Sequence, residues 1–168
     1  MKIDNSFVVP VPVEQAWPLL LDVPSIAPCL PGAELTEVVG PQHYRGRAVV
    51  KVGPVQLTFE GEAQIVDIDE AARTARVVAK GSDKKGRGNA AATVLFALAE
   101  DPAGSRVDVS TDLSLVGAVA QYGRGAGLMK AIADQLVGQF AANLGALLRQ
   151  AAGETGKLPP AGTPISGL

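Results

Sequence analysis

Polar and apolar residues alternate with a period of two over most of the central chain. The alternation is clearest in four segments, residues 44–52, 55–65, 74–80 and 106–115. One apolar and one polar face is typical of strands in an antiparallel sheet with one side in water. Turn-forming residues separate the segments at 53–54, 69–72, 84–86 and 101–104. The pattern therefore predicts a sheet connected by hairpins.

The segments before and between these strands are less regular. Residues 3–9 end in apolar, β-branched residues before two prolines, which predicts a first strand. Residues 13–21 have helical spacing, and Pro18 limits them to a short helix. Asp22 is placed to cap a second short helix that runs toward Cys29. Residues 88–100 are apolar on both faces, and their position between two turns favours a strand covered on both sides.

The period returns to 3.6 near the C-terminus, from Arg124 to about Gln150. This predicts an amphipathic helix roughly 40 Å long, which Gly153 and Gly156 would end. The predicted class is α+β, with a curved antiparallel sheet of six to seven strands wrapped around the long C-terminal helix. Two short helices follow the first strand. Residues 1–152 are expected to form one domain, and 153–168 a flexible tail of linker composition cut short at Leu168.

The inward strand positions are mostly small. They include Gly46, Ala48, Gly61, Ala63, Ala75, Ala79, Ala90 and Ala92. Small side chains leave two alternatives: the helix packs closely on the sheet, or the two layers enclose an apolar cavity for a ligand. The alternation predicts that larger apolar residues face the same space: Phe59, Val94, Phe96, Leu115, Leu128, Ile132, Leu136 and Phe140.

Composition and charge narrow the possible functions. The chain has 168 residues, 47% of them hydrophobic, which is sufficient for one folded domain. A net charge of -2 argues against nucleic-acid binding. The single cysteine, Cys29, excludes an internal disulfide and a cysteine-based zinc site. Asp4 interrupts any secretory signal, and the longest uncharged stretch, 135–148, falls short of the about 18 residues that a membrane span needs.

Few residues are suited to catalysis. His43 is the only histidine and is expected in a solvated turn, so no Ser-His pair or two-histidine metal site is predicted. Cys29 lies among prolines and is expected to be a packed, inert thiol. Glu60 and Glu62 share the polar face of a strand. The sequence predicts no catalytic residue and no metal site.

Charge is concentrated in residues 71–88. Six basic residues stand there against Asp83: Arg73, Arg76, Lys80, Lys84, Lys85 and Arg87. The segment is either a solvated hairpin or a contact for anionic lipid headgroups or an acidic protein, with Lys80, Lys84, Lys85 and Arg87 as candidate contacts.

Tyr122 and Arg124 precede the long helix. They either supply hydrogen-bond donors to a ligand at a cavity mouth, or stand in a turn that the neighbouring glycines require.

The element order and several short motifs resemble the START-like (SRPBCC, helix-grip) superfamily, and within it the CoxG family of carbon monoxide dehydrogenase subunits. The resemblance covers about residues 1–150. The motifs are residues 12–14, Trp17, 20–22, 26–34 (IAPCLPGAE), 51–54 (KVGP), Phe59, Gly61, 80–81, 86–90 and 121–124 (QYGR).

The resemblance implies a cytoplasmic, non-catalytic accessory protein of a molybdenum-containing carbon monoxide dehydrogenase. It also implies peripheral association with the inner face of the membrane. The electrons from carbon monoxide must enter a respiratory chain, so the expected ligand is an isoprenoid quinone, menaquinone or ubiquinone, bound without a covalent link. Two alternatives stay open: a START-like enzyme of the cyclase or dehydratase type, and a structural membrane-docking adaptor with a filled core.

Overall fold

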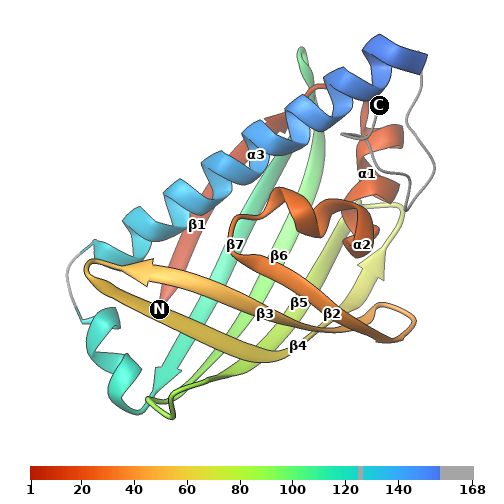
Figure 1. The fold of residues 1–168 in the computed structure, drawn as a ribbon. Helices are drawn as coiled ribbons and strands as arrows, with labels where there is room; N and C mark the ends of the chain where they lie inside the picture. The colour runs from red at the N-terminus through yellow and green to blue at the C-terminus, as the bar shows by residue number, and fades with distance from the viewer. Residues whose placement is uncertain (125–126, 156–168) are drawn as a thin grey trace.

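The computed structural model of the protein describes residues 1–124 and 127–155. Within them a seven-stranded antiparallel sheet has the strand order β1-β7-β6-β5-β4-β3-β2 (Figure 1). The strands are β1 (Lys2–Val9), β2 (Ala33–Gly40), β3 (His43–Val52), β4 (Val55–Asp69), β5 (Thr74–Asp83), β6 (Asn89–Asp101) and β7 (Gly104–Val116). The α+β class and the curved sheet expected from the alternating pattern are confirmed.

The helices follow the expected order, with corrections at the ends of the long one. They are α1 (Val13–Leu21), α2 (Val23–Ile26), η1 (Ala27–Cys29), η2 (Ala118–Gly123) and α3 (Leu128–Thr155). The long helix begins at Leu128 and not at Arg124, because the 3-10 helix η2 precedes it. Gly153 lies inside α3, so the predicted stop there is wrong; one glycine costs a helix only about 1 kcal/mol. Gly156 and the rest of the expected tail lie outside the described residues.

The cap of α2 and the cover of β6 differ from expectation. Asp22 does precede α2, but its carboxylate accepts a hydrogen bond from the Ser25 hydroxyl at 2.7 Å, and no backbone N–H is capped by it. The strand β6 is not covered on both sides. Its outward residues Ala91, Thr93 and Leu95 are exposed, since the helices of the described chain pack on the inner face of the sheet.

Glycines on the inner face allow the sheet to bend. Gly46, Gly61 and Gly81 pair in register across β3, β4 and β5, and Ala90 continues the row on β6. A Cβ atom at Gly61 would clash with the Lys80 carbonyl oxygen. Missing side chains therefore let neighbouring backbones approach closely and the sheet curve. Part of the small-residue pattern serves curvature, a role that neither sequence-based alternative considered.

The buried residues form two clusters at opposite ends of the inner face. The α1-end cluster gathers residues of α1, β1, β4, β5, β6, β7 and α3. Its members are Val9, Val13, Ala16, Trp17, Leu20, Cys29, Ile65, Ala75, Phe96, Leu98, Val107, Leu144 and Leu148. The η2-end cluster is smaller and consists of Val52, Leu57 and Val119, with partly buried neighbours packed against it.

Candidate ligand-binding site

Between the two clusters the inner face is lined by small side chains. Ala63, Ala79 and Ala92 pair in register across β4, β5 and β6, next to the glycine row. Val94 on β6 and Leu136 on α3 are half-buried and belong to neither cluster. We call this stretch, residues 61, 63, 79, 81, 90, 92, 94 and 136, the ligand region. All of its residues are half-buried.

The residues predicted to line one space are distributed over three places. Five pack against the η2-end cluster: Phe59, Leu115, Tyr122, Leu128 and Ile132. Phe96 is a buried member of the α1-end cluster, and Phe140 packs against that cluster. Val94 and Leu136 lie between, and Arg124 is exposed just after η2. The structure thus places most of the predicted lining at the two ends of the ligand region.

Burial along α3 is uneven, although its apolar stripe is continuous in sequence. Leu144 and Leu148 are buried in the α1-end cluster. Leu128, Ile132 and Leu136, nearer the start of the helix, remain half-buried. A helix packed closely on a sheet would bury its whole apolar stripe. The first half of α3 therefore covers the inner face less tightly than the second half.

Contacts that sequence reasoning missed hold α3 in this position. The Lys130 ammonium donates to the Asp4 carbonyl oxygen at 2.8 Å, and the Asn5 side-chain amide donates to Asp134 at 2.6 Å. The rings of Phe7 and Phe140 meet edge to face, with centroids 5.7 Å apart. These contacts fix the helix along β1 at one edge of the sheet (Figure 1). A polar residue on the surface of a helix does not indicate, in the sequence alone, which distant residue it will contact.

Near the second half of the helix, the Asn143 amide donates to the Cys29 carbonyl oxygen at 2.8 Å, which ties α3 to η1. None of these attachments uses a residue of the ligand region. The region can therefore change its packing without releasing the helix.

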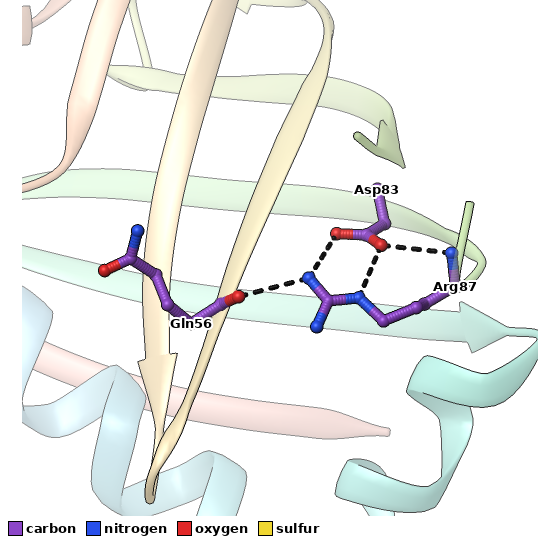
Figure 2. A network of polar contacts seen from close by, with 3 residues as sticks. All are labelled: Gln56, Asp83 and Arg87. Atoms are coloured by element: carbon purple, nitrogen blue, oxygen red, sulfur yellow. Dashed lines mark hydrogen bonds and ion pairs between the residues drawn. The ribbon is translucent and has the colours of Figure 1, made fainter. Parts of the chain in front are cut away.

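An ion pair joins the loops at the η2 end (Figure 2). The Arg87 guanidinium donates to both carboxylate oxygens of Asp83, at 2.7 and 3.0 Å, and to the Gln56 carbonyl oxygen at 3.1 Å. The Val119 backbone N–H donates to the Arg87 carbonyl oxygen at 2.9 Å. The pair therefore connects the β5–β6 hairpin with β4 and η2.

Asp83 is the one buried carboxylate among the described residues, and its side chain is 0% exposed. The hydrogen bond from Arg87 is the main cause that lowers its pKa to about 2, against an opposing effect of desolvation. Asp83 stays ionised and paired at neutral pH. It is unsuited to proton transfer, because a general acid or base needs a pKa near the working pH.

The other titratable candidates lie elsewhere. The His43 Nε2 is 3.2 Å from Glu62, which also pairs with Lys80, and these contacts lower the pKa of the Glu62 carboxyl, the His43 hydrogen bond most. Cys29 is buried, and burial raises the pKa of its thiol, which disfavours the reactive thiolate. In residues 1–124 and 127–155, no group of three His, Cys, Asp or Glu residues could hold a metal ion.

The basic segment 71–88 is divided between the two ends of β5. Arg73 and Arg76 lie at one end, near Glu14 and Asp67, at 3.9 and 2.9 Å. Lys84 and Lys85 are exposed in the hairpin at the other end, roughly 30 Å away along the strand. Because a strand separates them, the six basic residues do not form one continuous patch.

A long helix held against the inner face of a curved seven-stranded antiparallel sheet, with apolar side chains between them, defines the helix-grip fold of START-like proteins. The chain belongs to the CoxG family of carbon monoxide dehydrogenase subunits, whose sequence model matches residues 6–148. The family confirms the resemblance drawn from the sequence motifs. Its name connects its members with carbon monoxide dehydrogenase. The family and the helix-grip fold together suggest an accessory, ligand-binding role.

Solved structures share the fold at low sequence identity. A conserved protein from Geobacillus kaustophilus has a TM-score of 0.76 and 18% identity, over 90% of this chain and 97% of that one. An aromatase/cyclase (Zhui) from a Streptomyces species has a TM-score of 0.63 and 13% identity, over 95% and 99%. The protein Ara h 8.0201 has a TM-score of 0.53 and 20% identity, over 89% and 98%. No curated protein matches the sequence.

Among the described residues, no helix is long and apolar enough to cross a membrane.

Proposed function

We propose that this protein is a non-catalytic accessory protein of a molybdenum-containing carbon monoxide dehydrogenase, and that it binds an apolar ligand between the sheet and α3. The observation that carries the proposal is the ligand region itself. Its side chains are glycine, alanine and valine on the sheet, and Leu136 opposite remains half-buried. Stable protein interiors are filled to high density, so an apolar surface that its own chain covers loosely suits a ligand.

The proposed ligand is a respiratory quinone, menaquinone or ubiquinone. Electrons from carbon monoxide must enter a respiratory chain, and isoprenoid quinones are confined to the bilayer because they are insoluble in water. The ligand region offers an apolar surface for the isoprenoid chain. Tyr122, which packs at the η2-end cluster, and Arg124 beside it carry donors that suit a quinone carbonyl oxygen. In this role the protein acts on the cytoplasmic face of the membrane and links the dehydrogenase to the respiratory chain.

Two alternative functions fit these residues less well. A START-like enzyme needs a titratable group beside its substrate, and the buried carboxylate of the described residues, Asp83, is engaged by Arg87. Similarity of fold to an aromatase/cyclase does not transfer its reaction. A structural adaptor with a filled core would need the first half of α3 to be buried as completely as the second.

Mass spectrometry of material extracted from the purified protein tests the proposal. We expect an isoprenoid quinone in stoichiometric amount. The empty protein should also retain a quinone offered in detergent and raise the rate at which the dehydrogenase reduces quinone. If no quinone is retained and the rate does not change, the quinone role is wrong, and the filled adaptor is the better account.

A further inference from the structure

Three loops at the η2 end carry cations without an ion-pair partner among the described residues. Lys51 lies at the end of β3, Lys84 and Lys85 form the tip of the β5–β6 hairpin, and Arg124 follows η2. All four side chains are exposed. The remaining basic residues of segment 71–88 differ, because Arg73, Arg76, Lys80 and Arg87 each have a carboxylate within 4.0 Å.

Backbone contacts show that these loops are neighbours. The Lys84 N–H donates to the Thr58 carbonyl oxygen at 2.8 Å, beside the β3–β4 hairpin. The Val119 N–H of η2 reaches the Arg87 carbonyl oxygen, so η2 touches the β5–β6 hairpin. In residues 52–55, 83–89 and 117–124 the one carboxylate is Asp83, which Arg87 already neutralises. We call this surface the cationic end.

The turns at the opposite end of the sheet carry more acidic than basic residues. The β4–β5 turn carries Asp69 and Glu70 beside Arg73, and the β6–β7 turn carries Glu100 and Asp101. Charge is thus separated along the strands, although the whole chain has a net charge of only -2. An anionic surface would therefore orient the molecule with the cationic end toward itself.

Apolar and hydrogen-bonding groups accompany the cations. Val116, at the end of β7, is 60% exposed, the largest exposure among the large apolar residues of the described chain. Beside it, a groove of about 340 Å³ on the outer face is lined in part by Lys80, Ser82, Asn89 and Ser114. The hydroxyl and amide donors of Ser82, Asn89 and Ser114 suit phosphate and glycerol oxygens. An exposed apolar residue among cations also suits the boundary between headgroups and acyl chains.

We propose that the cationic end is the surface that docks on an anionic phospholipid membrane, through Lys51, Lys84, Lys85 and Arg124 with Val116 among them. The inference rests on the proposed function, because a ligand that resides in a bilayer must be collected there. The η2-end cluster lies directly behind this surface, so the path from the headgroups to the ligand region is short. Segment 71–88 as a whole does not act as the contact; the contact is made by the cations of three loops that have no ion-pair partner among the described residues.

Sedimentation with quinone-free vesicles tests the surface. The vesicles are phosphatidylcholine alone, or an equimolar mixture with phosphatidylglycerol, at low and physiological salt. The variant Lys84→Glu/Lys85→Glu is compared with Arg73→Glu/Arg149→Glu, which changes the net charge equally at the other end of the sheet and of α3. Each basic residue near an anionic surface contributes about fivefold in binding. We therefore expect at least about a tenfold loss for the first variant on anionic vesicles, and a change within about twofold for the second.

Melting temperatures of both variants confirm that they fold, and Lys51→Glu provides a further variant away from the hairpin. An equal loss in both double variants, or no loss in either, would overturn the proposed surface. Unchanged vesicle binding with lost capture of the dehydrogenase would also overturn it, in favour of an acidic protein partner. Quinone retention from detergent does not involve Lys51, Lys84 or Lys85. A parent protein that retains no quinone would contradict the proposed function. A parent protein that retains quinone but binds neutral and anionic vesicles equally would contradict the docking surface alone.

Discussion

Leu136 is the residue at which the two interpretations, a loosely covered inner face and a filled core, predict the most different effect of a larger side chain. Its side chain belongs to neither cluster, so a larger side chain should occupy space that the ligand would otherwise take. We expect Leu136→Trp to abolish quinone retention and to change the free energy of unfolding by less than about 1 kcal/mol. The matched control is Leu144→Trp, because Leu144 is 1% exposed in the α1-end cluster and overpacking there should cost about 1–3 kcal/mol. Equal destabilisation of the two variants in denaturant titrations would show that the first half of α3 is tightly packed as well.

Because of Asp83, the stability of the folded protein depends on pH in the acidic range. The pKa of Asp83 is lowered to about 2 in the folded protein, from an ordinary value of 3.8. The stabilisation is therefore complete above pH 4 and is lost as the pH falls from 4 through about 2. We expect Asp83→Asn to be less stable than the parent at pH 6, and the difference to shrink by pH 2.5. Free energies of unfolding at several pH values check this. A difference that stays constant down to pH 2.5 would mean that the pKa of Asp83 is the same in the folded and the unfolded protein.

At the scale of elements, the bend of the sheet depends on missing side chains. A Cβ at Gly61 would meet the Lys80 backbone, which cannot move as a flexible side chain does. We expect Gly61→Ala to destabilise the protein by about 1–3 kcal/mol. Gly138, inside α3, has open space around its Cβ position, so Gly138→Ala should stabilise by about 0.5–1 kcal/mol. Thermal unfolding of both variants measures the two opposite changes. A neutral Gly61→Ala would show that β4 and β5 can separate without cost.

Local sequence patterns predicted the elements well, because alternation and helical periodicity report which face of an element is buried. The same patterns failed where a contact depends on distant residues. The apolar residues 88–100 predicted a strand covered on both sides, yet nothing in their own sequence indicates that Ala91, Thr93 and Leu95 on the outer face of β6 are exposed. Asp83 and Arg87 appeared as opposite charges in a basic hairpin, and only the fold turns Asp83 inward. The predicted lining was divided because strand parity gives the face of a residue and not its position along the sheet.

At the scale of the whole molecule, the two ends of the sheet differ in both packing and charge. The α1 end has the larger core, in which α1 and the second half of α3 close over the strands. The η2 end has a small core, loops joined by the ion pair of Asp83 and Arg87, and cations that have no ion-pair partner in the described part of the chain. Rigid packing at one end can hold the fold while the other end admits a ligand, since local stability follows the number of buried contacts. The proposed membrane surface and the proposed ligand entry therefore fall at the same end.

Ligand binding should stabilise the whole fold, because the ligand region is assembled from β4, β5, β6 and α3 and is absent from the unfolded chain. A ligand at about 100 times its Kd adds about 2.7 kcal/mol to the free energy of unfolding. For a chain of this size, that corresponds to a rise in melting temperature of about 5 to 10 °C. We expect an isoprenoid quinone in detergent to produce this rise in the parent protein and none in Leu136→Trp. A quinone without the isoprenoid chain should raise the melting temperature less, because most of the apolar contact would be missing. A similar rise in the parent and in Leu136→Trp would place the binding site outside the ligand region.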